Sequence, residues 1–476
     1  MASVFISGNF SVLHPGHIRL FQLAKKLGDV LVIGVNSDNE TISSLNVPLE
    51  LRLESLKTIK LVDQIIVIEK SLEETLSTLK PNIVLKGPEH KNRFNKEESI
   101  INEFGGKLVF GSGDFSMSSE EFMANHRNEK FEVNDRTNAF LKRHAINPKE
   151  IVNLVQTFSQ LRVLVIGDLI IDDYIECESI GMSQEDPLVV FRALSKQRFV
   201  GGAGIVALHA TSLGAKTSLI TLAGNDAESN FAAEKFKASG LDFHFVSEGA
   251  ESTILKQRYR INGKTNFRLN RFDDLVVSNE TRAEFLRKAL ELLPEVDLVI
   301  FSDFNYGILD TEMVSSIVSE ARAREIFVSA DCQISSQIGD YSKYKGVDLV
   351  TPTEHEVRVT LRDNSSGLAA IANNFQEQLG APYLLITLGA DGMLLQEKSK
   401  VVNSQFLTDS IPAISEKVTD VAGAGDSVLV VASLALAARA NLQQAAYLGT
   451  TAAALQVNRV GNTPLGINEL IQVISK

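Results

Sequence analysis

Hydrophobic side chains in the first 110 positions form short continuous runs separated by segments with helical spacing. The runs cover residues 4–7, 30–35, 65–68, 83–85 and 108–110. After the first run, apolar residues recur at helical spacing from position 18 to position 27, and Gly28 follows as a residue that commonly ends a helix. Continuous apolar strands that alternate with helices are typical of a parallel sheet covered on both faces. The pattern therefore predicts an α/β domain in this part of the chain.

A second alternation of strands and helices runs from residue 162 to residue 476, with apolar runs at 162–167, 298–301, 326–330, 349–351 and 384–387. Before it, Asn147, Pro148 and Glu150 have the order of a helix start. The preceding stretch lacks the Gly, Ser or Pro richness of a flexible linker. We therefore expect two doubly wound, Rossmann-like parallel-sheet domains, joined by a helical connector. The expected boundaries are 1–130 for the first domain, 131–161 for the connector and 162–476 for the second domain.

Composition and charge narrow the function classes. A chain of 476 residues is long enough for about two to four domains. Its 47 basic and 59 acidic residues leave a net charge of −12, which disfavours nucleic acid as a partner. The two cysteines, Cys177 and Cys332, cannot form a disulfide framework, so we expect a reducing compartment. Neither a signal-peptide pattern nor an apolar run of the roughly 18 residues needed for a membrane span is present, which predicts a cytoplasmic protein without a membrane partner.

Residues 8–17 connect the first predicted strand to the first predicted helix and contain two histidines three positions apart. A glycine-containing turn at this point directs backbone N–H groups and the positive end of the helix dipole toward the strand end, which suits a phosphate group. His14 and His17 would then donate hydrogen bonds to the phosphate in its transition state. The alternative is that His14 caps the helix and His17 is an exposed helical residue.

The segment His14-Pro15-Gly16-His17 resembles the HxGH signature of nucleotidyltransferases, which join a phosphorylated alcohol to a nucleoside monophosphate. The resemblance implies that Lys86 acts with both histidines in catalysis. It also implies a nucleotide site that includes Gly8, Phe10, Arg52, Ser118 and Ser119. Two positions depart from the family pattern, because Ser11 stands where Asp is usual and Glu120 where Thr is usual. A carboxylate at position 120 would repel a polyphosphate unless it faces away or approaches a metal.

Residues 419–427 form the sharpest motif of the second domain and precede an apolar, alanine-rich helix. Small residues let the backbone wrap closely, so the N–H groups of Gly423, Ala424 and Gly425 can form an anion hole at the helix N-terminus. Asp426 would stand beside the transferred phosphate and accept a proton from the attacking hydroxyl. The alternative is a glycine-rich turn with a capping aspartate.

Together with the segments at 167–172, 199–204 and 387–392, this motif resembles the ribokinase-type (PfkB-type) sugar kinases. The resemblance implies a small β lid, a sugar site at Asp172, Gly201 and Gly202, and a base at Asp426. It further implies that Glu356 organises Mg²⁺ through a water molecule and that ATP lies against Thr387, Gly389, Gly392 and Asn458. Three positions depart from the family pattern: Ile205, Gln333 and Thr353.

Segments 167–174, 182–190, 253–259 and 302–304 are similar to the heptose-7-phosphate kinases, a branch commonly fused to an HxGH adenylyltransferase for ADP-heptose synthesis, as in lipopolysaccharide biosynthesis. This finer resemblance implies that Lys256, Arg258 and Asp303 contact the sugar phosphate. The usual fusion has the kinase first, whereas this chain has the reverse order. The resemblance also implies a homodimer through the lid, at roughly 175–200, and a separate phosphatase acting between the two reactions.

The sequence therefore predicts a bifunctional enzyme that phosphorylates a sugar phosphate at its anomeric hydroxyl and then transfers an adenylyl group from ATP, with Mg²⁺ as cofactor. Two alternatives stay open. The same reactions could use another sugar or polyol phosphate, or CTP. A scaffold or regulatory protein with one or both sites decayed is the other alternative, favoured by Ser11, Glu120 and Ile205.

Overall fold

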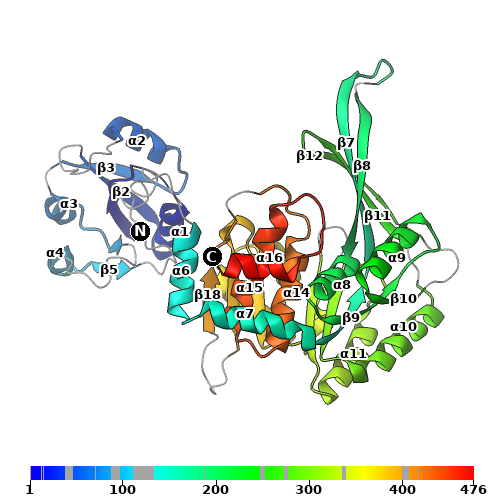
Figure 1. The fold of residues 1–476 in the computed structure, drawn as a ribbon. Helices are drawn as coiled ribbons and strands as arrows, with labels where there is room; N and C mark the ends of the chain where they lie inside the picture. Colours follow the sequence, from blue (N-terminus) through cyan, green and yellow to red (C-terminus); the bar gives the residue numbers. More distant parts are fainter. Residues whose placement is uncertain are drawn as a thin grey trace. The chain divides into compact units, whose positions relative to one another are not determined.

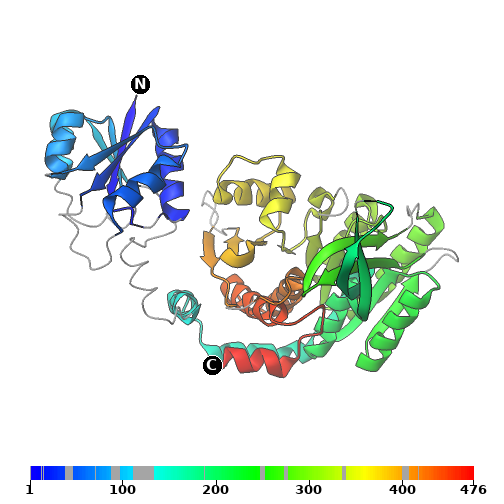
Figure 2. The same cartoon turned by 90° about the horizontal axis from the view of Figure 1, so that it is seen from above.

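The computed structural model describes residues 2–475 except 12, 14, 38–46, 70, 87–96, 111–132, 187, 247–251, 273–276, 335–338, 399–406 and 416–417. The chain forms two compact units, Met1–Glu132 and Val133–Lys476 (Figures 1 and 2). No helix in the described part of the chain is both long and apolar enough to cross a lipid bilayer. Each unit is described separately below.

The first unit is built on a parallel sheet with the strand order β3-β2-β1-β4-β5. Its strands are β1 (Ser3–Gly8), β2 (Val30–Asn36), β3 (Gln64–Ile68), β4 (Ile83–Lys86) and β5 (Lys107–Phe110), and its helices are α1 (Pro15–Leu27), α2 (Leu49–Lys57), α3 (Leu72–Leu79) and α4 (Glu97–Glu103). Alternate residues of β1 belong to two separate hydrophobic cores: Val4 and Ile6 pack in the core of Phe21 of α1, and Phe5 packs in the core of Leu76 of α3. This burial on both faces explains the continuous apolar runs in the sequence.

The strand order reverses between β1 and β4, because the chain builds β2 and β3 on one side before it returns to build β4 and β5 on the other. In open parallel sheets, such a switch point leaves a crevice at the carboxyl ends of the two strands, where ligands bind. Gly8 ends β1 and Lys86 ends β4 at this edge.

The second unit contains a sheet of nine strands in the order β10-β9-β6-β13-β14-β15-β16-β17-β18. The strands from β10 to β16 are parallel, whereas β17 and β18 are antiparallel to their neighbours. Their bounds are β6 Arg162–Gly167, β9 Lys216–Leu222, β10 Asp242–Val246, β13 Leu298–Asp303, β14 Phe327–Cys332, β15 Leu349–Val350, β16 Tyr383–Thr387, β17 Met393–Glu397 and β18 Leu407–Ile411. The predicted α/β fold class with parallel sheets is confirmed in both units.

Helices cover both faces of this sheet and enclose two hydrophobic cores. They are α6 (Val133–Arg143), α7 (Pro148–Gln156), α8 (Ala203–Ser212), α9 (Ala227–Ser239), α10 (Asn279–Leu292), α11 (Thr311–Ala323), α12 (Glu354–Leu361), α13 (Leu368–Leu379), α14 (Ala424–Ala437), α15 (Leu442–Val457) and α16 (Ile467–Ile474), with short 3₁₀ helices at Thr157–Gln160, Leu293–Glu295, Tyr341–Tyr344 and Gly389–Asp391. Figure 2 shows α7 beside α16, and the buried Ile151 and Val155 of α7 belong to the larger core. Asn147 caps α7 and Pro148 opens it, as the sequence predicts.

A second sheet of the same unit, here called the lid, has the strand order β12-β11-β7-β8. Its strands are β7 (Leu169–Met182), β8 (Val189–Gly202), β11 (Ile254–Ile261) and β12 (Lys264–Arg271). In Figure 1, β7 and β8 form a long ribbon that projects past the helices of the unit. Successive side chains of a strand point to opposite faces, so the residues of β7 and β11 alternate between the two sides of the lid. The small β lid implied by the resemblance is therefore present.

Candidate active sites

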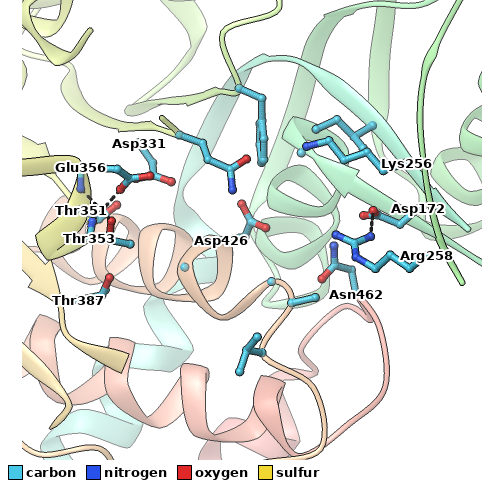
Figure 3. A pocket seen from close by; sticks show the side chains of 18 residues that line it. Asp172, Lys256, Arg258, Asp331, Thr351, Thr353, Glu356, Thr387, Asp426 and Asn462 are labelled. Atoms are coloured by element: carbon cyan, nitrogen blue, oxygen red, sulfur yellow. Dashed lines mark hydrogen bonds and ion pairs between the residues drawn. The ribbon is translucent and has the colours of Figure 1, made fainter. Parts of the chain in front are cut away.

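A cavity of about 240 Å³ lies in the second unit, between the carboxyl ends of the parallel strands, the lid and the N-terminus of α14 (Figure 3). Asp426 of α14 lies in its middle. At one end, here called the lid end, the wall is formed by Asp172, Lys256, Arg258 and Asn462. At the other end, here called the sheet end, the wall is formed by Asp331, Thr351, Thr353, Glu356 and Thr387.

The loop before α14 turns at Gly423, which has a φ of +76° and is the N-cap of the helix. The next residues, Ala424 to Asp426, form the first turn of α14, so their N–H groups have no partners within the helix and form an anion-binding terminus. Burial and, secondly, the negative charge of Asp172 raise the pKa of Asp426 to about 7, although the Lys256 ammonium acts in the opposite direction. The sequence-predicted anion hole and Asp426 therefore share one wall of the cavity.

The lid end takes its charged side chains from two neighbouring parallel strands. Asp172 on β7 pairs in register with Lys256 on β11, and Tyr174 pairs with Arg258, so these four residues lie on one face of the lid. Arg258 forms an ion pair with Asp172, and its guanidinium lies over the Tyr174 ring. The intervening Asp173 belongs to the opposite face, where it pairs with Arg198 and Lys196.

Lys256 differs from the other charged residues of the lid end in its surroundings, which are mainly aromatic. Its ammonium lies 4.8 Å from the centre of the Phe304 ring and 5.5 Å from that of Tyr306. Burial lowers the pKa of Lys256, while the charge of Asp172 partly restores it. Among the described residues it forms no hydrogen bond or ion pair within bonding distance, in contrast to Arg258. A partly buried ammonium that lies against two aromatic rings can bind an anion.

At both glycines predicted to contact the sugar, neighbouring atoms come so close that no larger residue would fit. A Cβ atom at Gly201 would lie 2.5 Å from the carboxylate of Asp172. Gly202 has a φ of +58°, and a Cβ atom there would lie 2.2 Å from the backbone oxygen of Asp168. Gly202 lines the cavity itself, whereas Gly201 supports the wall behind Asp172.

The sheet end gathers carboxyl and hydroxyl groups. Glu356 accepts hydrogen bonds from the backbone N–H groups of Thr353 (2.7 Å) and Ile334 (3.3 Å), and Thr353 caps α12 in return. Burial raises the pKa of Glu356. Burial together with the negative charge of Glu356 raises the pKa of Asp331 well above its usual range. In the described part of the chain, no group of three or more His, Cys, Asp or Glu side chains could enclose a metal ion alone.

Several sequence-predicted residues do not line this cavity. Asp303 is buried behind it, where its carboxylate is paired with Lys343 and accepts a hydrogen bond from Tyr344 (2.7 Å). Thr387 lines the sheet end, but Gly389, Gly392 and Asn458 lie outside the lining. Ile205, one of the departures from the family pattern, is fully buried in α8 and reaches no ligand space.

Sequence reasoning missed several residues of the cavity, among them Asp331 and Thr351 at its sheet end. Asn462 lies in the loop after α15 and lines the lid end, with no motif to mark it. Asp420 belongs to the motif at residues 419–427 and connects parts of the structure. It accepts hydrogen bonds from Tyr174 Oη (2.8 Å), Gly461 N (3.0 Å) and Ala422 N (3.1 Å). These bonds tie the lid and the loop of Asn462 to the anion hole.

In the first unit, Arg52 of α2 is almost fully buried and organises the strand ends. Its guanidinium donates hydrogen bonds to the backbone oxygens of Asn9 (2.8 Å), Asn36 (2.9 Å) and Val47 (2.9 Å). Asn36 in turn donates a hydrogen bond from its side chain to that of Asn9 (2.7 Å). Arg52 therefore holds together the carboxyl ends of β1 and β2, next to the expected nucleotide site.

Of the other predicted residues that the structure describes in this unit, Gly8 and Lys86 end the two strands at the switch point, and Phe10 and His17 follow β1. The His17 ring contacts Phe10 (5.0 Å between ring centres) and Phe21 (6.3 Å), which also contact each other (5.9 Å), and Phe10 has a φ of +50°. A Cβ atom at Gly8 would be 3.2 Å from the Phe10 ring. Lys86 forms an ion pair with Glu97 of α4 (2.8 Å). His14, Ser118, Ser119 and Glu120 lie outside the described residues.

Comparison with known proteins gives the class of the chain. Residues 160–467, more than half of the sequence, match the family described as pfkB family carbohydrate kinase. The chain therefore belongs to the pfkB family of carbohydrate kinases. Residues 5–137 match the family described as Cytidylyltransferase-like. These matches confirm the resemblances drawn from both halves of the sequence.

The curated relatives include two bacterial proteins named Bifunctional protein HldE. That of Helicobacter pylori (strain J99) is 30% identical over 319 residues, which cover 66% of each chain. That of Desulfatibacillum aliphaticivorans is 33% identical over 322 residues, which cover 66% of this chain and 63% of the relative. Each match thus spans slightly less than two thirds of the relative's own length.

Solved structures support the fold of the second unit. Ribokinase from Thermotoga maritima is 20% identical, with a TM-score of 0.52, and the match covers 66% of this chain and 100% of that one. Phosphofructokinase-2 from Escherichia coli is 16% identical, with a TM-score of 0.55, and the match covers 66% of this chain and 99% of that one. At these identities the likeness establishes the ribokinase-like fold alone.

Proposed function

We propose that this protein is a bifunctional enzyme of activated-sugar synthesis, with a kinase site in the second unit and a nucleotidyltransferase site in the first. The kinase would phosphorylate heptose 7-phosphate at its anomeric hydroxyl, and the transferase would then move an adenylyl group from ATP to the sugar 1-phosphate. The observation that carries the proposal is the partly buried Lys256 ammonium, which shares one cavity with Asp426. An unphosphorylated sugar would leave that charge without an anionic partner.

In the proposed kinase reaction, the anomeric oxygen attacks the γ-phosphorus of ATP. A new oxygen–phosphorus bond forms, the bond to the ADP oxygen breaks, and Asp426 accepts the proton of the attacking hydroxyl. The N–H groups at the start of α14 stabilise the transferred phosphoryl group. Lys256 binds the distal phosphate, while Asp172 accepts hydrogen bonds from sugar hydroxyls and Arg258 orients that carboxylate.

The residues of the sheet end fit Mg²⁺. Carboxylate and hydroxyl oxygens are the ligands that this ion prefers, and it usually keeps several water molecules and binds substrate phosphates. Asp331 and Glu356, whose pKa values are raised where no cation is present, would hold the ion, with Glu356 acting through water. When bound, the ion would neutralise charge on the ATP phosphates. Thr387 would lie beside the nucleotide, and Gly389, Gly392 and Asn458 stay predictions for the same role.

In the first unit, the sugar 1-phosphate would attack the α-phosphorus of the nucleotide and release pyrophosphate. His14, His17 and Lys86 would stabilise the charge, with Gly8, Phe10, Arg52, Ser118 and Ser119 around the nucleotide. CTP is the second candidate donor, and the match to the Cytidylyltransferase-like family favours it. Release of pyrophosphate from ATP or from CTP, measured with heptose 1-phosphate, separates the two donors.

Three features of the biological setting belong to the proposal. Both reactions would occur in the cytoplasm, where ATP is supplied and where the free, buried thiols of Cys177 and Cys332 stay reduced. A separate phosphatase would remove the distal phosphate between the two steps. A homodimer through the lid would cover the large apolar side chains exposed on its projecting ribbon: Ile180, Met182, Leu188, Phe191 and Leu194.

The direct test combines pure protein with MgATP and heptose 7-phosphate, followed by mass spectrometry. We expect ADP and heptose 1,7-bisphosphate. A panel of other sugar and polyol phosphates, tested in parallel, identifies a different acceptor. If no member of the panel is phosphorylated, the kinase half of the proposal is wrong.

The raised pKa of Asp426 predicts the pH dependence of the kinase. A base with a pKa of about 7 is mostly protonated at lower pH, so kcat/KM should fall about tenfold per pH unit below 6.5 and level off above 7.5. The measurement is the initial rate of ADP formation between pH 5.5 and 9. The residual activity of Asp426→Ala serves as the control, because without the base it should lose this inflection. A wild-type profile that stays flat down to pH 5.5 would contradict the assignment.

Replacing Lys256 by methionine should weaken binding of the phosphorylated acceptor. Methionine retains the length and the apolar contacts with Phe304 and Tyr306 but removes the charge, so we expect the KM for heptose 7-phosphate to rise about 30- to 100-fold, with the KM for ATP little changed. Steady-state kinetics with each substrate varied give both constants. Lys288→Met, on the surface of α10, is the matched control. Equal effects on both KM values would contradict an acceptor-specific role.

A further inference from the structure

The side-chain amide of Asn462 is buried at the lid end of the cavity, and its oxygen receives no hydrogen bond from the described residues. Only 8% of the residue is exposed, and among the described residues its Oδ1 atom has no hydrogen-bond partner. Leaving a buried oxygen unpaired destabilises the folded protein, and native proteins retain few such groups. Since Asn462 also lines the cavity, a bound molecule is the natural source of the missing donor.

The surroundings of Asn462 show which ligand it meets. A Cβ atom at Gly423, in the anion hole, would lie 2.2 Å from Asn462 Oδ1, and one at Gly201 would lie 3.4 Å from Asn462 Nδ2. The amide thus spans the anion hole and the glycine behind Asp172. Figure 3 shows it between Asp426 and the Asp172–Arg258 pair, away from Thr353 and Thr387. It therefore faces the phosphoryl acceptor and not the nucleotide.

The loop that carries Asn462 is held rigidly. Gly461 donates its N–H to Asp420 (3.0 Å), and its backbone oxygen accepts a hydrogen bond from the side chain of Gln456 (2.9 Å). The same Gln456 side chain also donates to the oxygen of Ala422, just before the anion hole (3.2 Å). The amide is therefore fixed relative to the reacting groups before the acceptor binds, as a group that discriminates between substrates must be.

We propose that Asn462 is a specificity-determining residue that accepts a hydrogen bond from the sugar hydroxyl next to the one that is phosphorylated. This inference rests on the proposed function. The anomeric carbon of a cyclic aldose has two ring neighbours: the ring oxygen, which cannot donate a hydrogen bond, and C2, whose hydroxyl can. An unpaired acceptor beside the anion hole therefore selects the C2 hydroxyl. The site should reject a 2-deoxy acceptor, because that ligand would leave Oδ1 desolvated and unpaired.

The test measures kcat/KM for heptose 7-phosphate and for its 2-deoxy analogue. In the wild-type enzyme we expect the analogue to be poorer by about 10- to 100-fold. In Asn462→Ala this ratio should fall below about threefold, because no acceptor remains to be left unpaired. Any intrinsic effect of the deoxy group on reactivity cancels in the comparison of the two enzymes. Asn230→Ala, an exposed asparagine of α9, should keep the wild-type ratio.

The possible failures are distinguishable. If the wild-type enzyme phosphorylates the parent sugar but Asn462→Ala discriminates as strongly as wild type, this inference is overturned while the proposed function stands. If the wild-type enzyme phosphorylates no sugar phosphate, the proposed function fails, and the inference with it. Should Asn462→Ala not fold, as judged by its thermal melting, Asn462→Ser keeps a shorter acceptor, and its ratio should lie between those expected for wild type and alanine. A ratio in the serine variant equal to that of wild type would overturn the inference.

Discussion

Replacing Asp426 by asparagine should reduce phosphoryl transfer to heptose 7-phosphate by about 10³-fold or more. Asparagine has almost the same size and leaves the first turn of α14 intact, but it cannot accept the proton of the attacking hydroxyl. General-base catalysis typically contributes about 10²–10⁴-fold, and the loss should appear in kcat while both KM values change little. The measurement is ADP formation under saturating MgATP and acceptor.

Two controls make this result specific. Asp242→Asn, an exposed carboxylate on β10, should keep full kinase activity. Nucleotidyl transfer by Asp426→Asn should equal that of the wild-type protein, because its proposed site lies in the other unit. If the asparagine variant retained more than a tenth of the wild-type rate, Asp426 would not be the base.

The reciprocal result is expected for His17→Ala, which should reduce pyrophosphate release by about 10²–10³-fold and leave the kinase rate unchanged. An imidazole N–H aimed at the phosphate is worth most in the transition state, where charge develops on its oxygens. Pyrophosphate release is measured with heptose 1-phosphate and either nucleotide. His244→Ala on β10 is the matched histidine control.

Because the His17 ring packs against Phe10 and Phe21, alanine would also remove packing contacts from the first unit. His17→Asn separates the two effects, since asparagine fills part of the space and can still donate a hydrogen bond. We expect it to recover a measurable part of the lost rate at an unchanged melting temperature. Equal activity of alanine, asparagine and wild-type proteins would show that His17 has no part in the transfer.

Local patterns were sufficient to predict the two α/β units and the glycine turn at the start of α14. A strand buried on both faces must be apolar along its whole length, and this signal needs only its own residues, as in β2 and β6. The glycine at position 423 also marks the turn before α14 in the sequence, because its positive φ is one that other residues rarely adopt.

Features set by distant parts of the chain could not be predicted. Asp172 lies within the long strand β7, and its register partners, Phe199 on β8 and Lys256 on β11, come 27 and 84 positions later in the chain. Asp303, expected to contact the sugar, does not line the cavity. Its carboxylate instead pairs with Lys343, which lies 40 positions later in the chain. Asn462 has no local signature at all; only the folded loop aims its amide into the cavity.

The pairing of β7 with β11 has a consequence for engineering. Lys256 and Arg258 occupy alternate positions of one strand, beside Asp172 and Tyr174, and the residues between them belong to the opposite face. Under the proposed function, the lid residues next to the acceptor's distal phosphate therefore occupy every second position of a short stretch of chain, apart from the groups at the sheet end. A library that varies only positions 256 and 258 would change the proposed contacts with the acceptor phosphate and leave the residues of the sheet end unaltered.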